Sequence, residues 1–194
     1  MNASEFIARA RKALNKGVRY NQRNRTFDPR TDAPPGGGLD CGTFVRWAVM
    51  PDPPMNQSRE PAWDTTSIFA DATGAQEFFQ KIAVPRPGCL IVYPDYKAVA
   101  QVTRDETKHD GHVAIVTETG TVEIDTPTGS KTFFGATRVI HCSRVIEGLR
   151  AELVPGAGRD SIAETNALVF YTFVPIYASV WRITPDTSQA ANRD

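Results

Sequence analysis

The second half of the chain is built from short apolar runs separated by polar turns, and this pattern restricts the fold more than any other feature. After "PRPG" come the runs "CLIVY", "HVAIVTE", "TVEID", "KTFFG", "TRVIHC" and "ASVWRIT". Runs of this length that are rich in β-branched and aromatic residues predict strands. We therefore expect an antiparallel sheet in this half.

The first half shows helical periodicity instead. Apolar residues recur at helical spacing over residues 3–15, and Asn2 followed by Glu5 predicts a capping box. A short buried helix is expected from Cys41 through "CGTFVRWAV", ended by "MPDPP", and another helix around "GAQEFFQKI". Helices followed by strands indicate the α+β class, with helices packed on a central antiparallel β-sheet.

Length and charge limit the classes of partner. The 194 residues suit a single domain, expected over residues 1–185 with a disordered tail over 186–194. Because 22 basic and 22 acidic side chains give zero formal net charge, we expect no nucleic-acid partner. The N-terminal segment lacks the apolar core of a secretory signal, and no run is long enough to span a bilayer, so synthesis in the cytoplasm is expected.

Cys41 follows a glycine run in "GGGLDCG" and opens the expected buried helix. The first N–H groups of a helix lack partners within the helix and carry partial positive charge, which favours a thiolate. The same N–H groups can bind the oxyanion that forms when a thiolate attacks a carbonyl. Cys41 is therefore a candidate nucleophile, although burial as a small apolar side chain fits equally well.

A nucleophilic cysteine needs a base, and the chain has three histidines. His112 follows Gly111 at the start of "HVAIVTE", so we expect its ring at the exposed end of a strand. His109 lies in a polar loop and is expected to be solvated. His141 is interpreted as a structural strand residue, because alternation sends it and Cys142 to opposite faces. His112 is thus the expected base.

A third group should orient the imidazole of the base. If "HVAIVTETGTVEID" is a hairpin that turns at Thr119 and Gly120, Asp125 lies diagonally across from His112 and within side-chain reach. Glu123 is the alternative, one step further along the sheet. Either carboxylate could instead be solvated on the sheet surface. We prefer Asp125.

Three segments in the same order resemble the NlpC-type cell-wall cysteine peptidases of the papain-like superfamily. "LDCGTFVRWAV" resembles the family's "DCSGFV" nucleophile segment, "PRPGCLIVYP" its "PGDLVVF" strand, and "GHVAIVTETGTVEID" its histidine hairpin. The resemblance implies a papain-like NlpC-type fold with the nucleophile at a helix N-terminus. It also implies a cysteine hydrolase that cleaves an amide bond in peptidoglycan stem peptides.

The resemblance assigns roles residue by residue. Cys41 becomes the nucleophile, His112 the general base and Asp125 the polar third residue. Tyr20 in "GVRYN" matches a tyrosine beside the family's active site, and Gly42 follows the nucleophile, so both are expected near the substrate or the oxyanion.

Other functions stay open at this point. The same cysteine and histidine could serve an acyltransferase or transpeptidase, or the chain could be a non-catalytic binding module that keeps the fold. A wall hydrolase without a signal segment suits an antibacterial effector, whose partner would be an immunity protein, or a phage lysin with a holin. It would act in the periplasm or cell wall after delivery by a secretion system, a phage or lysis.

We expect no metal and no organic cofactor, because the sequence has no ligand cluster and "PPGGGLDCGT" lacks the lysine of a P-loop. Cys89, which stands where the family has an aspartate, and Cys142 are expected to be buried, unreactive thiols. The late aromatic residues are expected to fill the core; they are Phe170, Tyr171, Phe173, Tyr177 and Trp181.

Overall fold

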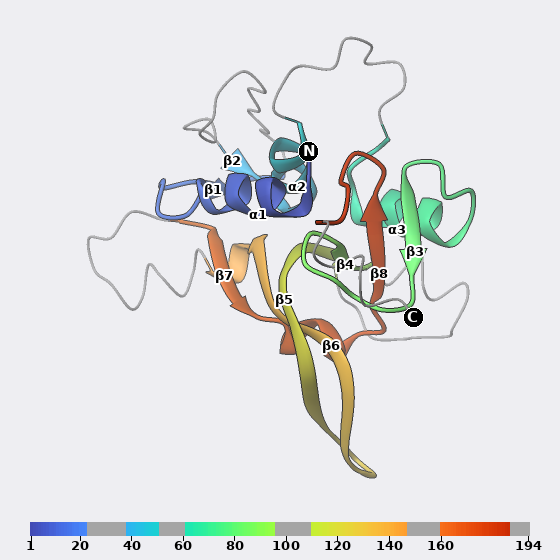
Figure 1. Cartoon of the computed structure of the whole chain (residues 1–194). Coiled ribbons are helices and arrows are strands. Elements are labelled where there is room, and N and C mark those ends of the chain that lie inside the picture. Colours follow the sequence, from blue (N-terminus) through green and yellow to red (C-terminus); the bar gives the residue numbers. More distant parts are fainter. Residues whose placement is uncertain (23–37, 51–60, 96–109, 147–159, 187–194) are drawn as a thin grey trace, which may run out of the picture.

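A computed structural model describes residues 1–22, 38–50, 61–95, 110–146 and 160–186 (Figure 1). Most of the tail expected over 186–194 lies outside these ranges. Helix α1 (Ala3–Arg11) begins with the predicted capping box, in which Asn2 accepts from the N–H of Glu5. It ends earlier than expected, and Asn15 then adopts a left-handed φ of 60°.

Helix α2 (Cys41–Val49) confirms the short buried helix that was expected to start at the candidate nucleophile. Asp40 caps it by accepting from the backbone N–H of Thr43, while the Thr43 hydroxyl accepts from the Asp40 N–H. The interior of the helix is apolar, and the side chains of Phe44 and Trp47 are fully buried. Apolar packing therefore fixes the helix, and the polar cap fixes where it starts.

The helix expected around "GAQEFFQKI" is wrong. Helix α3 (Thr65–Thr73) lies upstream, and the expected segment contains strand β3 (Phe79–Ile82). The carboxylate of Asp71 accepts from the backbone N–H groups of Phe78 and Phe79, which turns the chain directly into the strand. Tertiary pairing of Phe79 with Val180 outweighs the local helical pattern.

The sheet has six strands in the order β3-β8-β4-β5-β6-β7, and all neighbouring pairs are antiparallel. The remaining strands of this sheet are β4 (Leu90–Tyr93), β5 (His112–Thr126), β6 (Gly129–Cys142), β7 (Ile162–Asn166) and β8 (Ile176–Val180). Two short strands, β1 (Arg19–Tyr20) and β2 (Gly38–Leu39), form a separate parallel pair. This mixture of helices and one antiparallel sheet agrees with the α+β class.

The two faces of the sheet carry separate apolar clusters. On one face, Leu90 and Val113 pack with buried residues of α1 and α2. On the other face, Tyr93 and Ala114 pack with Phe170 of the 3-10 helix η2 (Leu168–Thr172). Phe170 thus fills the core as expected, but Trp181 is 40% exposed.

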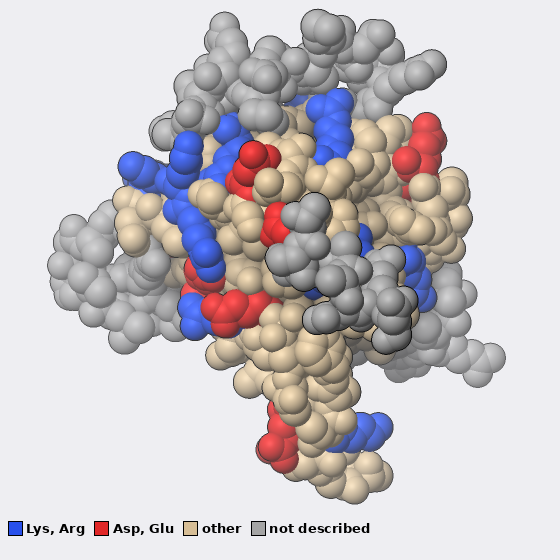
Figure 2. Space-filling view, in the orientation of Figure 1, with Lys and Arg blue, Asp and Glu red and all other residues tan. Residues whose placement is uncertain are grey.

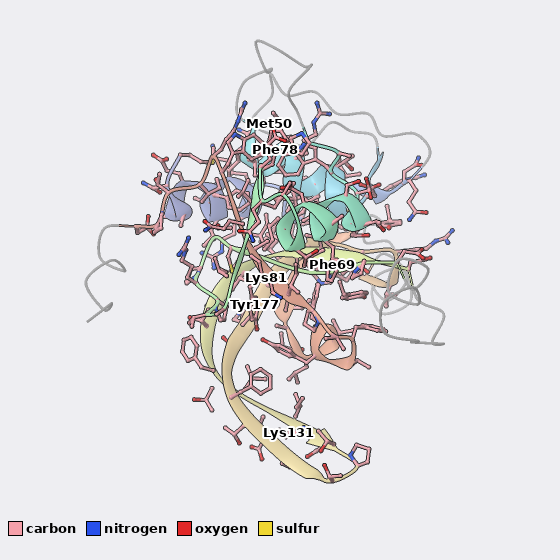
Figure 3. All side chains as sticks on the ribbon, turned by 90° about the vertical axis from the view of Figure 1, so that its right-hand side faces the viewer. Met50, Phe69, Phe78, Lys81, Lys131 and Tyr177 are labelled. Atoms are coloured by element: carbon pink, nitrogen blue, oxygen red, sulfur yellow. The ribbon has the colours of Figure 1, made fainter. Side chains whose placement is uncertain are left out.

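The hairpin of β5 and β6 is much longer than predicted. The turn expected at Thr119 and Gly120 is wrong, because Thr119 pairs with Ala136 and the strands continue to the pair Thr126–Gly129. Gly129 has a φ of 116°, a conformation that glycine adopts without strain. The hairpin projects away from the helices, and Lys131 lies near its far end (Figures 1 and 3).

All three cysteines are free and buried, as expected for Cys89 and Cys142. Burial raises the pKa of Cys89 to about 12, which keeps this thiol protonated. Within the ranges described above, no helix has the length and apolar character needed to cross a membrane.

Candidate active site

Cys41 lies at the first turn of α2, at one wall of a hollow of about 200 Å³. The backbone N–H groups of Val113, Gly42 and Cys41 itself lie near the sulfur, where they lower the pKa of the thiol. Val113 is the residue after His112, so the sulfur lies beside the start of strand β5. The candidate nucleophile thus lies near the strand end that carries the candidate base, but Cys41 packs on the helical side of the sheet while the His112 ring stacks on Phe170 on the other side.

Four aspartates are among the residues that line this hollow together with Cys41, Trp63 and Gly111; they are Asp40, Asp64, Asp95 and Asp110. Two of them also serve the fold, because Asp40 caps α2 and Asp64 caps α3. The hollow therefore has local negative character and would favour a ligand with an amino group. Figure 2 shows acidic and basic side chains interspersed among the described residues of one face of the molecule.

Gly42 has a structural role that the sequence did not reveal. A Cβ atom at this position would overlap the backbone carbonyl oxygen of Trp63, so only glycine allows this close approach. Trp63 also lines the hollow. Gly42 therefore allows the Trp63 backbone to lie close beside Cys41, while its own N–H group lies near the sulfur.

His112 opens β5 and pairs with Tyr93 of the neighbouring strand β4. Its ring stacks on Phe170, with 5.4 Å between centroids, and lies 6.3 Å from the ring of Tyr93. Its Nε2 atom lies 2.7 Å from Nδ1 of His141. Aromatic packing and this hydrogen bond together hold the imidazole in one orientation.

The structure places His141 of β6, and not Asp125, in hydrogen-bond contact with His112. His141 is 6% exposed, and its Nε2 atom lies 3.1 Å from the hydroxyl oxygen of Thr165 on strand β7. Asp125 is an exposed residue of the projecting part of the hairpin, where it accepts from the Ser130 hydroxyl. Glu123, the alternative, is also exposed and pairs with Thr132.

This difference follows from the hairpin register. Because the strands run on to Thr126, the antiparallel register places Ile115 opposite Ile140. Extended by one residue, it places His141 opposite Ala114, diagonally across from His112 on the same face. The apolar runs "HVAIV" and "TRVIHC" could have revealed this register, because pairing them directly with each other brings His141 close to His112.

Tyr20 lies near Cys41, as expected. It pairs with Leu39 in the short parallel ladder that leads into α2. Burial raises the pKa of its phenol, and the nearby Cys41 and Asp40 raise it further.

Tyr93 on β4 also lies near Cys41, and the sequence did not point to it. Burial and, to a smaller extent, Cys41 raise the pKa of Tyr93 to about 12. Both tyrosines are therefore neutral hydrogen-bond donors near pH 7.

The helix start was expected to favour the thiolate of Cys41, but the structure favours the protonated thiol. Burial raises the pKa of Cys41 to about 12, with a further contribution from Asp40, and this outweighs the nearby N–H groups. Burial lowers the pKa of His112 to about 3, and the neighbouring His141 contributes. Burial lowers the pKa of His141 to about 4. The thiol of Cys41 and the imidazoles of His112 and His141 are therefore all neutral near pH 7.

In the part of the chain that the structure describes, no group of three or more histidine, cysteine or carboxylate side chains is placed to hold a metal ion. A thiol at a helix N-terminus and a pair of imidazoles lie near the same strand end, but Cys41 packs with the apolar cluster on the helical side of the sheet and both imidazoles pack against Phe170 on the other side. Sequence comparison finds no match to this chain among protein-family models and none among curated proteins.

Proposed function

We propose that the chain is a cysteine hydrolase with a papain-like, NlpC-type fold that cleaves an amide bond in peptidoglycan stem peptides. The observation that carries this proposal is the position of the Cys41 sulfur beside the first residues of β5, where His112 is held by a hydrogen bond to His141. A thiol at a helix start, a nearby imidazole and a group that orients it are what acyl transfer through a thioester requires.

The chemistry starts from a neutral pair. Nε2 of His112 bonds to His141, so Nδ1 is the nitrogen left to accept the proton of Cys41. The thiol proton passes to Nδ1 as the sulfur attacks the amide carbonyl, because a free thiolate is unfavourable in this buried setting. His112 then returns the proton to the departing amine. Water hydrolyses the resulting thioester, with His112 again as the base.

The oxyanion of the tetrahedral intermediate needs donors that are already in place. The backbone N–H groups of Cys41 and Gly42 lie near the sulfur and are suited to this role. The phenol of Tyr20, which remains protonated near pH 7, is a further donor.

The choice of substrate rests on the resemblance to the cell-wall peptidases and on the charge of the hollow. Stem peptides contain a diamino acid, and four aspartates are among the residues that line the hollow beside Cys41. An amino group near the scissile amide would be attracted to this wall. In biological terms, we propose an antibacterial effector with an immunity protein as partner, or a phage lysin, that acts on the cell wall after delivery.

One observation favours a second candidate, a binding module that keeps the fold without catalysis. Cys41 is 7% exposed and its pKa is raised to about 12, as expected for an unreactive thiol. In that case the hollow would bind a ligand, and replacement of Cys41 by serine would leave the binding intact.

Digestion of purified peptidoglycan separates the two candidates. The wild-type protein should release soluble stem-peptide fragments, detected by mass spectrometry together with a new primary amine. Cys41→Ser and His112→Ala should release none, while the control Cys89→Ala, which changes a buried thiol of the other apolar cluster, should keep the activity. Intact sacculi with the wild-type protein would contradict the hydrolase.

A further inference from the structure

We propose that Thr165 is a positioning residue that sets the tautomer of His141 and, through it, leaves Nδ1 of His112 free to act as the base. The catalytic consequence rests on the proposed function, but the tautomers themselves can be measured without any turnover. Thr165 was not among the candidate residues from the sequence, because it lies on a strand that the sequence analysis did not predict.

Three side chains from three neighbouring strands form one chain of hydrogen bonds. Nε2 of His112 on β5 lies 2.7 Å from Nδ1 of His141 on β6, and Nε2 of His141 lies 3.1 Å from Oγ1 of Thr165 on β7. The register of β6 and β7 pairs Ala163 with His141 and Thr165 with Val139. Thr165 is therefore diagonal to His141 on the same face of the sheet.

The direction of the chain follows from the single proton of the threonine hydroxyl. Thr165 donates this proton to the backbone carbonyl of Asn166 at 3.1 Å. Its oxygen must then accept, so the proton of the neutral His141 ring lies on Nε2. Nδ1 of His141 is left as an acceptor, and it receives the Nε2–H of His112. The remaining nitrogen of His112, Nδ1, carries a lone pair.

The opposite arrangement would block the proposed chemistry. If His141 carried its proton on Nδ1, the bond to His112 would require an unprotonated Nε2 on that ring. The neutral ring of His112 would then be protonated on Nδ1 and could not accept the proton of Cys41. Both rings are neutral near pH 7, because burial lowers both pKa values, so the tautomer matters. The Thr165 hydroxyl selects one of the two arrangements.

Replacing Thr165 by valine keeps the branched shape and removes the hydroxyl, whereas Thr165→Ser keeps the hydroxyl. Two-bond ¹H–¹⁵N correlation spectra of the imidazoles report which nitrogen carries the proton. We expect the Nε2–H tautomer for both His112 and His141 in the wild type and in Thr165→Ser. We expect a mixture of tautomers in Thr165→Val. Thr165→Ala provides a second variant without the hydroxyl should the valine variant fail to fold.

Kinetics on a stem-peptide substrate give a second readout. Thr165→Val should lower kcat by about tenfold, the order expected for one lost orienting hydrogen bond, with little change in KM. Thr165→Ser should recover most of this loss. Wild-type tautomers in the variants without the hydroxyl would overturn the inference. Absence of any turnover in the wild type would count against the hydrolase only, because the spectra still report the tautomers.

Discussion

Replacing His141 by alanine tests which side chain orients His112. His141 is 6% exposed, and its ring makes both hydrogen bonds of the chain. Loss of a buried ring leaves a cavity that costs about 2–4 kcal/mol. The buried N–H of His112 also loses its acceptor, which costs about 1–3 kcal/mol. We therefore expect the free energy of unfolding to fall by about 3–7 kcal/mol.

Thermal unfolding followed by circular dichroism measures this loss. For a chain of this length, each kcal/mol corresponds to about 2–4 °C, so Tm should fall by roughly 15 °C. The kcat of folded His141→Ala should fall by about a hundredfold or more, because the His112 imidazole loses the partner that fixes its tautomer.

Asp125→Ala is the matched control, because this residue was the orienting group expected from the sequence. Its side chain is exposed on the projecting hairpin and accepts a local hydrogen bond from Ser130. We expect Tm to stay within about 1 °C and kcat to be unchanged. An equal loss of kcat in Asp125→Ala and His141→Ala would refute the reasoning.

Three further predictions follow from burial and packing around the site. The pKa values of His112 and His141 are lowered to about 3 and 4, so the unfolded chain binds more protons below pH 6.5. Stability should be full above pH 7 and fall by about 4 kcal/mol by pH 5 in denaturant titrations, and a flat profile over this range would contradict the burial. Cys41, with a pKa of about 12, should react with iodoacetamide about a thousandfold more slowly at pH 7 than an ordinary thiol of pKa 9.0; a rapid reaction that is independent of pH would instead indicate an ion pair. Gly42→Ala should lower the free energy of unfolding by about 2 kcal/mol or more, because its Cβ meets the Trp63 carbonyl, and an unchanged Tm would show that the backbone yields freely.

The parts of the fold that were predictable from the sequence depend on local interactions. The capping box of Asn2 and Glu5 and the start of α2 at Cys41 involve residues within one helical turn. Cys41 was also placed correctly at a helix start, because the helical apolar pattern begins directly after Asp40. Strand β4 was also predictable, because its apolar run is bounded by prolines.

The parts that were missed depend on pairing between distant residues. "TETGT" resembles a tight turn, yet pairing of Thr119 with Ala136 and Gly120 with Gly135 extends the strands through it. His141 meets His112 only in that register, and it also contacts Thr165 of yet another strand. The protonation of Cys41 was missed for a related reason, since burial by the sheet outweighs the local effect of the helix start.

Intact-protein mass spectrometry during turnover tests the central claim most directly. The wild-type protein is mixed with a purified stem peptide and quenched in acid, and the modified residue is located by fragmentation. The account predicts a transient mass increase equal to the acyl portion of the substrate, carried by Cys41 and absent from His112→Ala. Product release by Cys41→Ser at the wild-type rate, or an adduct on another residue, would contradict it.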